Sequence, residues 1–149
     1  MSEQTERTRV DAVARSWLGT PYHHHAQIKG VGTDCANLLI GTYAEAGLIE
    51  NFDPGYYAPQ FFLHSKEERF LGWVQKFSRE IPGSEAKVGD IVIYKLGLVY
   101  AHGGIIVAPG WPHAIIHAHR ASRRVCLSGG LSAELGRPAR HPRFFTRWR

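Results

Sequence analysis

Residues 32–47 read GTDCANLLIGTYAEAG, and they mark the change from a polar loop to a helix. Asp34 is a residue type that caps helices, and Gly47 is a residue type that ends them. Between these two positions, one helical face carries Leu38, Leu39, Thr42, Tyr43 and Ala46. The pattern therefore predicts a helix whose first turn contains Cys35.

Two further helices are predicted on either side of this one. Residues 5–18 place apolar side chains at helical spacing and are followed by Gly19-Thr20-Pro21, which ends a helix. The sequence Ser65-Lys66-Glu67-Glu68 matches a capping box and predicts the start of a third helix. The apolar stripe of that helix comprises Phe70, Trp73, Val74 and Phe77.

The second half of the chain changes to the pattern of strands. Short apolar or β-branched runs between Gly and Pro turns predict strands at residues 88–94, 103–107, 114–119, 124–127 and 143–148. Helices that precede strands indicate an α+β fold, with the helices packed on an antiparallel sheet of about five strands.

Length and composition predict a single domain over residues 1–149, because one core is the norm below about 200 residues. The hydrophobic share of 44% and the charged share of 21% are those of a globular protein. No apolar run reaches the roughly 18 residues of a membrane span, and the start MSEQTERTRV does not resemble a secretory signal. We therefore expect synthesis in the cytoplasm and no membrane span.

The net charge of +5 is distributed unevenly. The residues from Arg120 onward carry +7, and residues 1–119 carry −2. In the C-terminal segment 137–149, Arg alternates with Phe and Trp, a pattern that suits stacking on nucleic-acid bases. It suits equally a strand that packs its aromatic face inward and offers its Arg face to an acidic partner. No nucleic-acid motif accompanies the charge, so the second interpretation is favoured.

The two cysteines lie in different settings. Cys126 lies in the apolar run RVCLS and is predicted to be a buried strand thiol. Cys35 lies at a predicted helix N-terminus, where free amides and the helix dipole favour a thiolate and can stabilise an oxyanion. A nucleophile also needs a base, and His102, His117 and His119 lie on neighbouring predicted strands. His117 and His119 share one face.

Four segments, taken in order, resemble the NlpC (p60) family of papain-like cell-wall cysteine peptidases. They are LGTPY (18–22), GTDCANLL (32–39), GDIVI (89–93) and AHGGII (101–106), the last followed by IHA (116–118). The resemblance covers most of the chain. It implies a papain-like fold, no cofactor, and hydrolysis of peptidoglycan stem peptides between D-glutamate and the diamino acid.

The resemblance also implies residue roles. It assigns Cys35 as the nucleophile, His102 as the general base and His117 as the polar group that orients the His102 ring. The residues expected near the oxyanion or the substrate are Tyr22, Asp34, Ala36 and His119.

Some positions depart from the usual family pattern. Ala36-Asn37 follow the Cys, Gly103-Gly104 follow the base, and the loop before the Cys contains His23-His24-His25-Ala26-Gln27. With Lys29-Gly30-Val31-Gly32, these features resemble the short versions found in prophage and gene-transfer-agent tails. That likeness implies tail proteins as partners, bound through the basic C-terminus, and action in the periplasm or on the cell wall.

Parts of the sequence are also compatible with three other functions. Adjacent His23, His24 and His25 cannot all ligate one ion, and no Cys-x-x-Cys or helical His-x-x-x-His is present, so no metal site is predicted. A non-catalytic tail component of the same fold remains an alternative. A basic nucleic-acid-binding module is the third.

Overall fold

The computed structural model describes residues 1–108, 114–129 and 134–148. Its helices are α1 (Glu3–Ser16), α2 (Cys35–Glu45) and α3 (Arg69–Gln75), with short 3-10 turns η1 (Phe61–Leu63), η2 (Gly83–Glu85) and η3 (Pro138–Arg140). None of the helices in these described ranges is long and apolar enough to cross a membrane.

The strands form one six-stranded antiparallel sheet and one small hairpin. The sheet order is β3 (Arg79–Ile81), β8 (Arg143–Thr146), β4 (Ile91–Leu96), β5 (Val99–Ala108), β6 (Ala114–His119) and β7 (Arg124–Gly129). The hairpin pairs β1 (Gln27–Ile28) with β2 (Gly32–Thr33). The α+β prediction is confirmed. The sequence missed β3, whose three residues are too few to show a period, and β8 therefore lies inside the sheet.

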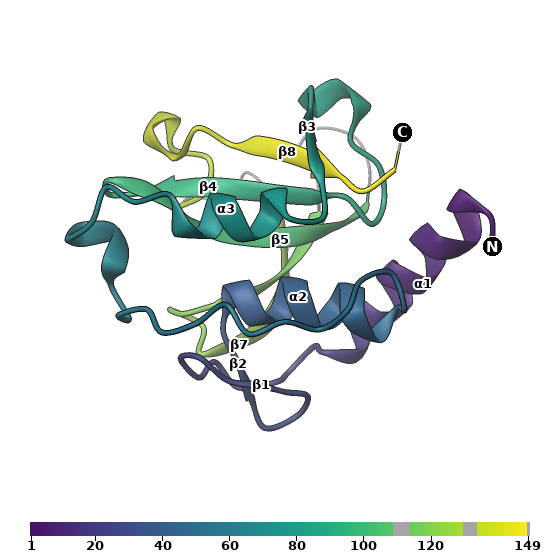
Figure 1. Cartoon of the computed structure of the whole chain (residues 1–149), viewed down its shortest axis with the longest axis horizontal. Helices are drawn as coiled ribbons and strands as arrows, with labels where there is room; N and C mark the ends of the chain where they lie inside the picture. The colour runs from purple at the N-terminus through teal and green to yellow at the C-terminus, as the bar shows by residue number, and fades with distance from the viewer. Residues whose placement is uncertain (109–113, 130–133, 149) are drawn as a thin grey trace.

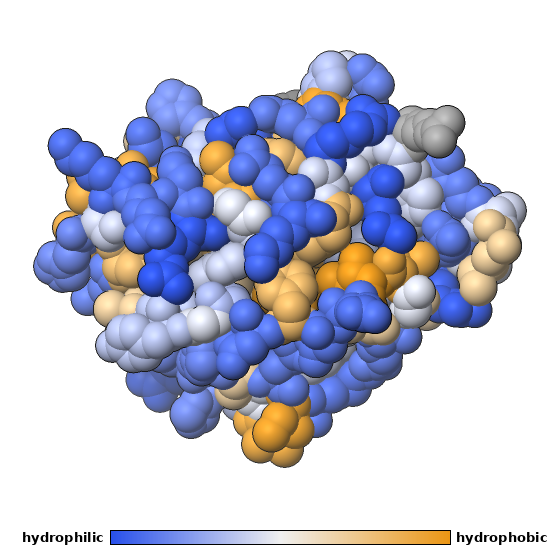
Figure 2. All heavy atoms as spheres, viewed as in Figure 1, coloured by the Kyte–Doolittle hydropathy of each residue, from blue (hydrophilic) through white to orange (hydrophobic). Residues whose placement is uncertain are grey.

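The helices cover one face of the sheet, with α2 packed on β5 and β6, α3 packed on β5, and α1 packed on α2 (Figure 1). A second group of buried side chains covers the opposite face and comprises Ile81, Ala86, Val92, Tyr94, Ile106, Ile115, Leu135 and Phe144. The central strands are therefore buried on both faces, which is why their sequences are continuous apolar runs. The outer surface seen in Figure 2 is mainly hydrophilic, with apolar side chains in separate groups.

The predicted capping box is wrong. The Ser65 hydroxyl accepts a hydrogen bond from the amide of Glu67 at 3.1 Å, within a turn that precedes the helix. Helix α3 begins at Arg69. The Glu68 carboxylate instead accepts the Tyr100 amide at the start of β5, at 2.9 Å. A contact between distant parts of the chain has taken the place of the local cap.

The C-terminal segment packs its aromatic side chains inward. Phe144, Phe145 and Trp148 are 6%, 1% and 8% exposed, whereas Arg143 forms a surface ion pair with Glu80 at 2.6 Å. These aromatic rings are thus unavailable for stacking on nucleic-acid bases. The inward-packing interpretation of the sequence is confirmed for these residues.

A buried ion pair joins the two ends of the chain to the sheet. Asp90 is fully buried and accepts hydrogen bonds from Arg7 at 3.0 Å, from the Thr146 hydroxyl at 2.6 Å and from the Lys87 amide at 2.8 Å. Arg7 also donates to the carbonyl of Val88 at 2.9 Å. The Asp of the Gly-Asp motif is therefore a structural centre for α1, β4 and β8.

We expect Asp90→Ala to lower the free energy of unfolding by about 3–5 kcal/mol, because it leaves the Arg7 guanidinium buried without its counter-charge. The matched control is Glu80→Ala, which breaks the surface pair with Arg143 and should cost about 0–1 kcal/mol. Urea unfolding followed by circular dichroism measures both. Equal losses in the two variants would contradict the structural role of Asp90.

Candidate active site

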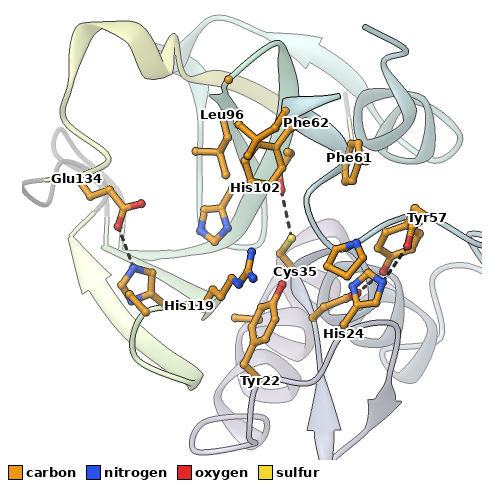
Figure 3. Close-up of a pocket in the computed structure, with 18 of the residues that line it drawn as sticks. Tyr22, His24, Cys35, Tyr57, Phe61, Phe62, Leu96, His102, His119 and Glu134 are labelled. Atoms are coloured by element: carbon orange, nitrogen blue, oxygen red, sulfur yellow. Dashed lines mark hydrogen bonds and ion pairs between the residues drawn. The ribbon is translucent and has the colours of Figure 1, made fainter. Parts of the chain in front are cut away.

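A pocket of about 710 Å³ opens between the N-terminus of α2 and the sheet (Figure 3). Five of the seven predicted site residues line it, namely Tyr22, Asp34, Cys35, His102 and His119. His117 lies directly behind His102. Ala36 is buried and lines a separate small apolar cavity with Phe70 and Trp73 rather than this pocket.

Cys35 is the first residue of α2 and is only partly exposed. Its thiol donates to the carbonyl of Ala101 at 3.4 Å (Figure 3). Burial, followed by the charge of Asp34, raises the pKa of Cys35, and the amides of Ala36 and Cys35 lower it by less. Desolvation outweighs the helix N-terminus, so the surroundings of Cys35 favour the thiol rather than the thiolate expected from its position in the helix.

His102 lies on β5, directly after Ala101, whose carbonyl accepts the Cys35 thiol. Its Nε2 lies 2.7 Å from Nδ1 of His117, so Nδ1 of His102 is the nitrogen left for the pocket. Burial, aided by the charges of His117, His119 and Arg140, holds the pKa of His102 well below its usual value. The imidazole is neutral at pH 7 and can accept a proton.

Gly103 and Gly104 let the surrounding elements approach this histidine. A Cβ on Gly103 would lie 3.1 Å from the Phe70 ring of α3, and one on Gly104 would lie 3.0 Å from the carbonyl of Ile116 and 3.3 Å from Cβ of His117. Larger residues would therefore push α3 and β6 away. The Gly-Gly pair keeps His117 within hydrogen-bonding distance of His102.

His117 connects His102 to β7. Its Nε2 lies 2.9 Å from the Ser128 hydroxyl and 3.6 Å from the sulfur of Cys126. Burial, with the charge of His119, lowers the pKa of His117 to about 4. In the tautomer that leaves Nδ1 of His102 unprotonated, His102 donates to His117, and His117 donates to Ser128.

The sequence did not point to Ser128, because only the pairing of β6 with β7 brings it near His117. Cys126 lies two residues before Ser128 on the same face of β7 and directly opposes His117 in the register. The thiol of Cys126 is partly exposed, so the prediction of a buried strand thiol is wrong.

Asp34 is buried, and its carboxylate accepts hydrogen bonds from neighbouring protein groups. One oxygen accepts the amide and the side-chain nitrogen of Asn37, both at 3.0 Å. The other accepts the amide of His25 at 2.8 Å and the Tyr57 hydroxyl. The carboxylate thereby fixes the start of α2, the loop that contains His23, His24 and His25 (the His loop) and the segment around Tyr57. Tyr57 is a second site residue that the sequence did not reveal.

The His loop holds the aromatic wall of the pocket. His24 Nε2 lies 2.8 Å from the carbonyl of Tyr57, and His25 Nε2 lies 2.8 Å from the carbonyl of Gly55. The segment that they hold continues into Phe61 and Phe62, which line the pocket (Figure 3). Within the described ranges, no group of three or more His, Cys, Asp or Glu is placed to hold a metal ion.

His119 and Tyr22 also line the pocket. His119 stacks on His117 with ring centres 5.0 Å apart, and its Nε2 lies 3.1 Å from the carboxylate of Glu134. Tyr22 points its hydroxyl toward Cys35 (Figure 3). Burial, followed by the charges of Cys35 and Asp34, raises the pKa of Tyr22, so this hydroxyl is a phenol that can donate a hydrogen bond.

Comparison with known proteins identifies the fold. No family model and no curated protein sequence matches the chain. Among solved structures, it is similar to the NlpC/p60 domain of the peptidoglycan hydrolase SagA, with 20% identity over 92% of this chain and 96% of that one and a TM-score of 0.60. It is also similar to the peptidoglycan hydrolase RipB from Mycobacterium tuberculosis, with 20% identity over 100% and 69% of the two chains and a TM-score of 0.64.

A third similar structure is an N-acetylmuramoyl-L-alanine amidase from Bacteroides uniformis ATCC 8492, with 15% identity over 95% and 98% of the two chains and a TM-score of 0.65. In two longer structures of the same kind the chain spans 45% and 39% of the other protein. The chain has the NlpC/p60 fold, as the sequence motifs indicated.

The raised pKa of Cys35 predicts slow alkylation at acidic pH. With Cys126→Ser to remove the second thiol, iodoacetamide labelling of Cys35 should accelerate about tenfold per unit of pH through the neutral and alkaline range. Mass spectrometry of the quenched protein gives the rates. Fast labelling that stays constant down to pH 5 would instead indicate a thiolate paired with an imidazolium.

Proposed function

We propose that this protein is a cysteine hydrolase of peptidoglycan stem peptides, cleaving the bond between D-glutamate and the diamino acid. The observation that carries the proposal is the presence of Cys35 and the His102–His117 pair at one pocket of an NlpC/p60 fold. Similarity to structures described as peptidoglycan hydrolases and as an amidase supports the substrate class. The choice of bond follows from the motif resemblance.

The first step in this mechanism transfers a proton from Cys35 to His102. The thiol exchanges its hydrogen bond to Ala101 for one to Nδ1 of His102. As Nδ1 takes the proton, the sulfur attacks the amide carbon, and the carbonyl electron pair moves to the oxygen. The new imidazolium keeps its Nε2 hydrogen bond to neutral His117.

The oxyanion would be stabilised at the start of α2. Asp34 engages the amide of Asn37 through its side chain and the amide of Leu38 through its carbonyl. The amides of Cys35 and Ala36, the first two of the helix, have no intrahelical acceptor and can donate to the oxyanion. The phenol of Tyr22 supplies a third donor on the other side.

Collapse of this intermediate breaks the carbon–nitrogen bond, and the leaving amine takes the proton from His102. Water then attacks the thioester, and His102 accepts a proton from that water. The carbon–sulfur bond breaks, and the sulfur recovers the proton from His102, which returns both groups to their starting state. No cofactor takes part in any step.

The proposed setting is a phage-like tail particle, in which the exposed Arg of the segment 137–149 bind other tail proteins. The likeness of the loop residues 23–32 to tail-associated versions supports it. Mass spectrometry of purified particles would detect the protein among the tail components, and its absence from particles that carry a complete tail would overturn this part of the proposal.

Digestion of purified muropeptides tests the activity. The native protein should release products cut after D-glutamate, and Cys35→Ala and Cys35→Ser should give none above the rate without protein. Mass spectrometry identifies the products, and circular dichroism verifies that the variants are folded. Equal turnover by native and variant proteins would exclude Cys35 as the nucleophile, and an inactive native protein would favour a structural role.

The pH dependence of kcat/KM should reflect the lowered pKa of His102. The base must be neutral, so activity is lost as pH falls through the pKa of His102, well below 6.5. We therefore expect kcat/KM to remain constant from pH 7.5 down to about 6. A half-maximal point at or above pH 6.5 would show that His102 titrates as an ordinary histidine.

A further inference from the structure

The acidic and basic residues that line the pocket differ in whether other protein groups bond to them. Its two carboxylates, Asp34 and Glu134, are already engaged, the first by three other residues and the second by His119 at 3.1 Å. Three arginines also line the pocket, namely Arg120, Arg123 and Arg140. Within the described ranges, their only side-chain hydrogen bond to the protein runs from Arg140 to the carbonyl of Lys95 at 3.4 Å. The pocket therefore presents unneutralised positive charge.

Arg120 lines the pocket from a turn that the backbone fixes next to Tyr22. It begins the tight turn between β6 and β7, in which the amide of Arg123 bonds to the carbonyl of Arg120 at 3.1 Å. The carbonyl of Arg123 then accepts the amide of Tyr22 at 2.8 Å. Burial and the charges of Cys35 and Asp34 raise the pKa of Tyr22, and the positive charge of Arg120 on the same pocket opposes that rise.

Arg140 lies beside the base. Its charge is among the causes that lower the pKa of His102. Its Nε is buried and has no hydrogen-bond partner among the described residues. No acceptor of the described protein satisfies this nitrogen, so the protein leaves the positive charge of Arg140 without a counter-charge. Arg120 thus acts on Tyr22, and Arg140 acts on His102.

We propose that Arg120 and Arg140 form a two-point carboxylate site that selects stem peptides whose carboxyl groups are free and disfavours amidated ones. This inference rests on the proposed function and specifies its substrate. A glutamyl residue linked through one carboxyl retains the other, and the diamino acid carries a carboxyl of its own. The substrate therefore offers an anion on each side of the scissile bond, and planar guanidinium groups match carboxylates.

The test compares four synthetic L-alanyl-D-glutamyl-diamino acid peptides, which are free, amidated at D-glutamate, amidated at the diamino acid, or amidated at both. Binding to the Cys35→Ala protein is measured by calorimetry, and cleavage by the native protein is measured as kcat/KM. Each amidation should weaken binding roughly 10- to 100-fold, since a charge-assisted hydrogen bond is lost. The loss should shrink at high salt, because Arg120 is exposed.

Each arginine should account for one of the two carboxylates. In the Cys35→Ala background, Arg120→Gln should abolish the penalty of one amidation, and Arg140→Gln that of the other. Arg120→Lys should restore only part of the discrimination, because a point charge lacks the bidentate fork. Arg124→Gln and Arg137→Gln are the matched controls, since these exposed neighbours do not line the pocket and should leave all four affinities unchanged.

The outcomes separate this inference from the proposed function. Equal affinity for free and doubly amidated peptides, or equal discrimination after both Gln substitutions, would overturn the carboxylate site even if the native protein cleaves every peptide. Absence of binding by any peptide would overturn it as well. Arginine-dependent binding without cleavage would support the site and contradict only the hydrolase.

Discussion

The site depends on one buried carboxylate. Asp34 receives hydrogen bonds from the start of α2, from the His loop and from Tyr57, so three segments that are remote in sequence meet at a single side chain. Burial, followed by this negative charge, raises the pKa of the adjacent Cys35. The anchor that positions the nucleophile therefore also favours its protonated form, and the site needs a neutral base within reach. Burial of His102, which lowers its pKa, meets that need.

The base in turn depends on how closely the strands pack. Nε2 of His102 lies 2.7 Å from Nδ1 of His117, because Gly103 and Gly104 allow α3 and β6 to approach β5. Both rings are buried, so both are neutral at pH 7, and the proton positions are set by hydrogen-bond direction rather than by charge. A neutral orienting group leaves the basicity of His102 to be tuned by other charges in the pocket.

The sequence anticipated features that depend on local order along the chain. The cap at Asp34, the placement of Cys35 in the first helical turn and the shared face of His117 and His119 all follow from the spacing of neighbouring residues. The α+β class followed from the order of helices and strands. Features that arise from contacts between distant segments were missed or wrong. Ser128 reaches His117 only through strand register, and the sign of the Cys35 pKa shift depends on burial that no local pattern records.

The arginines that give the C-terminal part its positive charge fall into two groups. Arg143 stabilises the surface of the C-terminal strand, whereas Arg120, Arg123 and Arg140 line the pocket. Burial, followed by the charges of His117, His119 and Arg140, lowers the pKa of His102, so the free protein holds a weak base. A carboxylate bound at Arg140 would offset that charge and raise the pKa of His102. His102 would then accept the Cys35 proton more readily with an anionic substrate in place than in the empty pocket. Recognition and activation would thus arise from the same guanidinium, and an uncharged peptide would lose both.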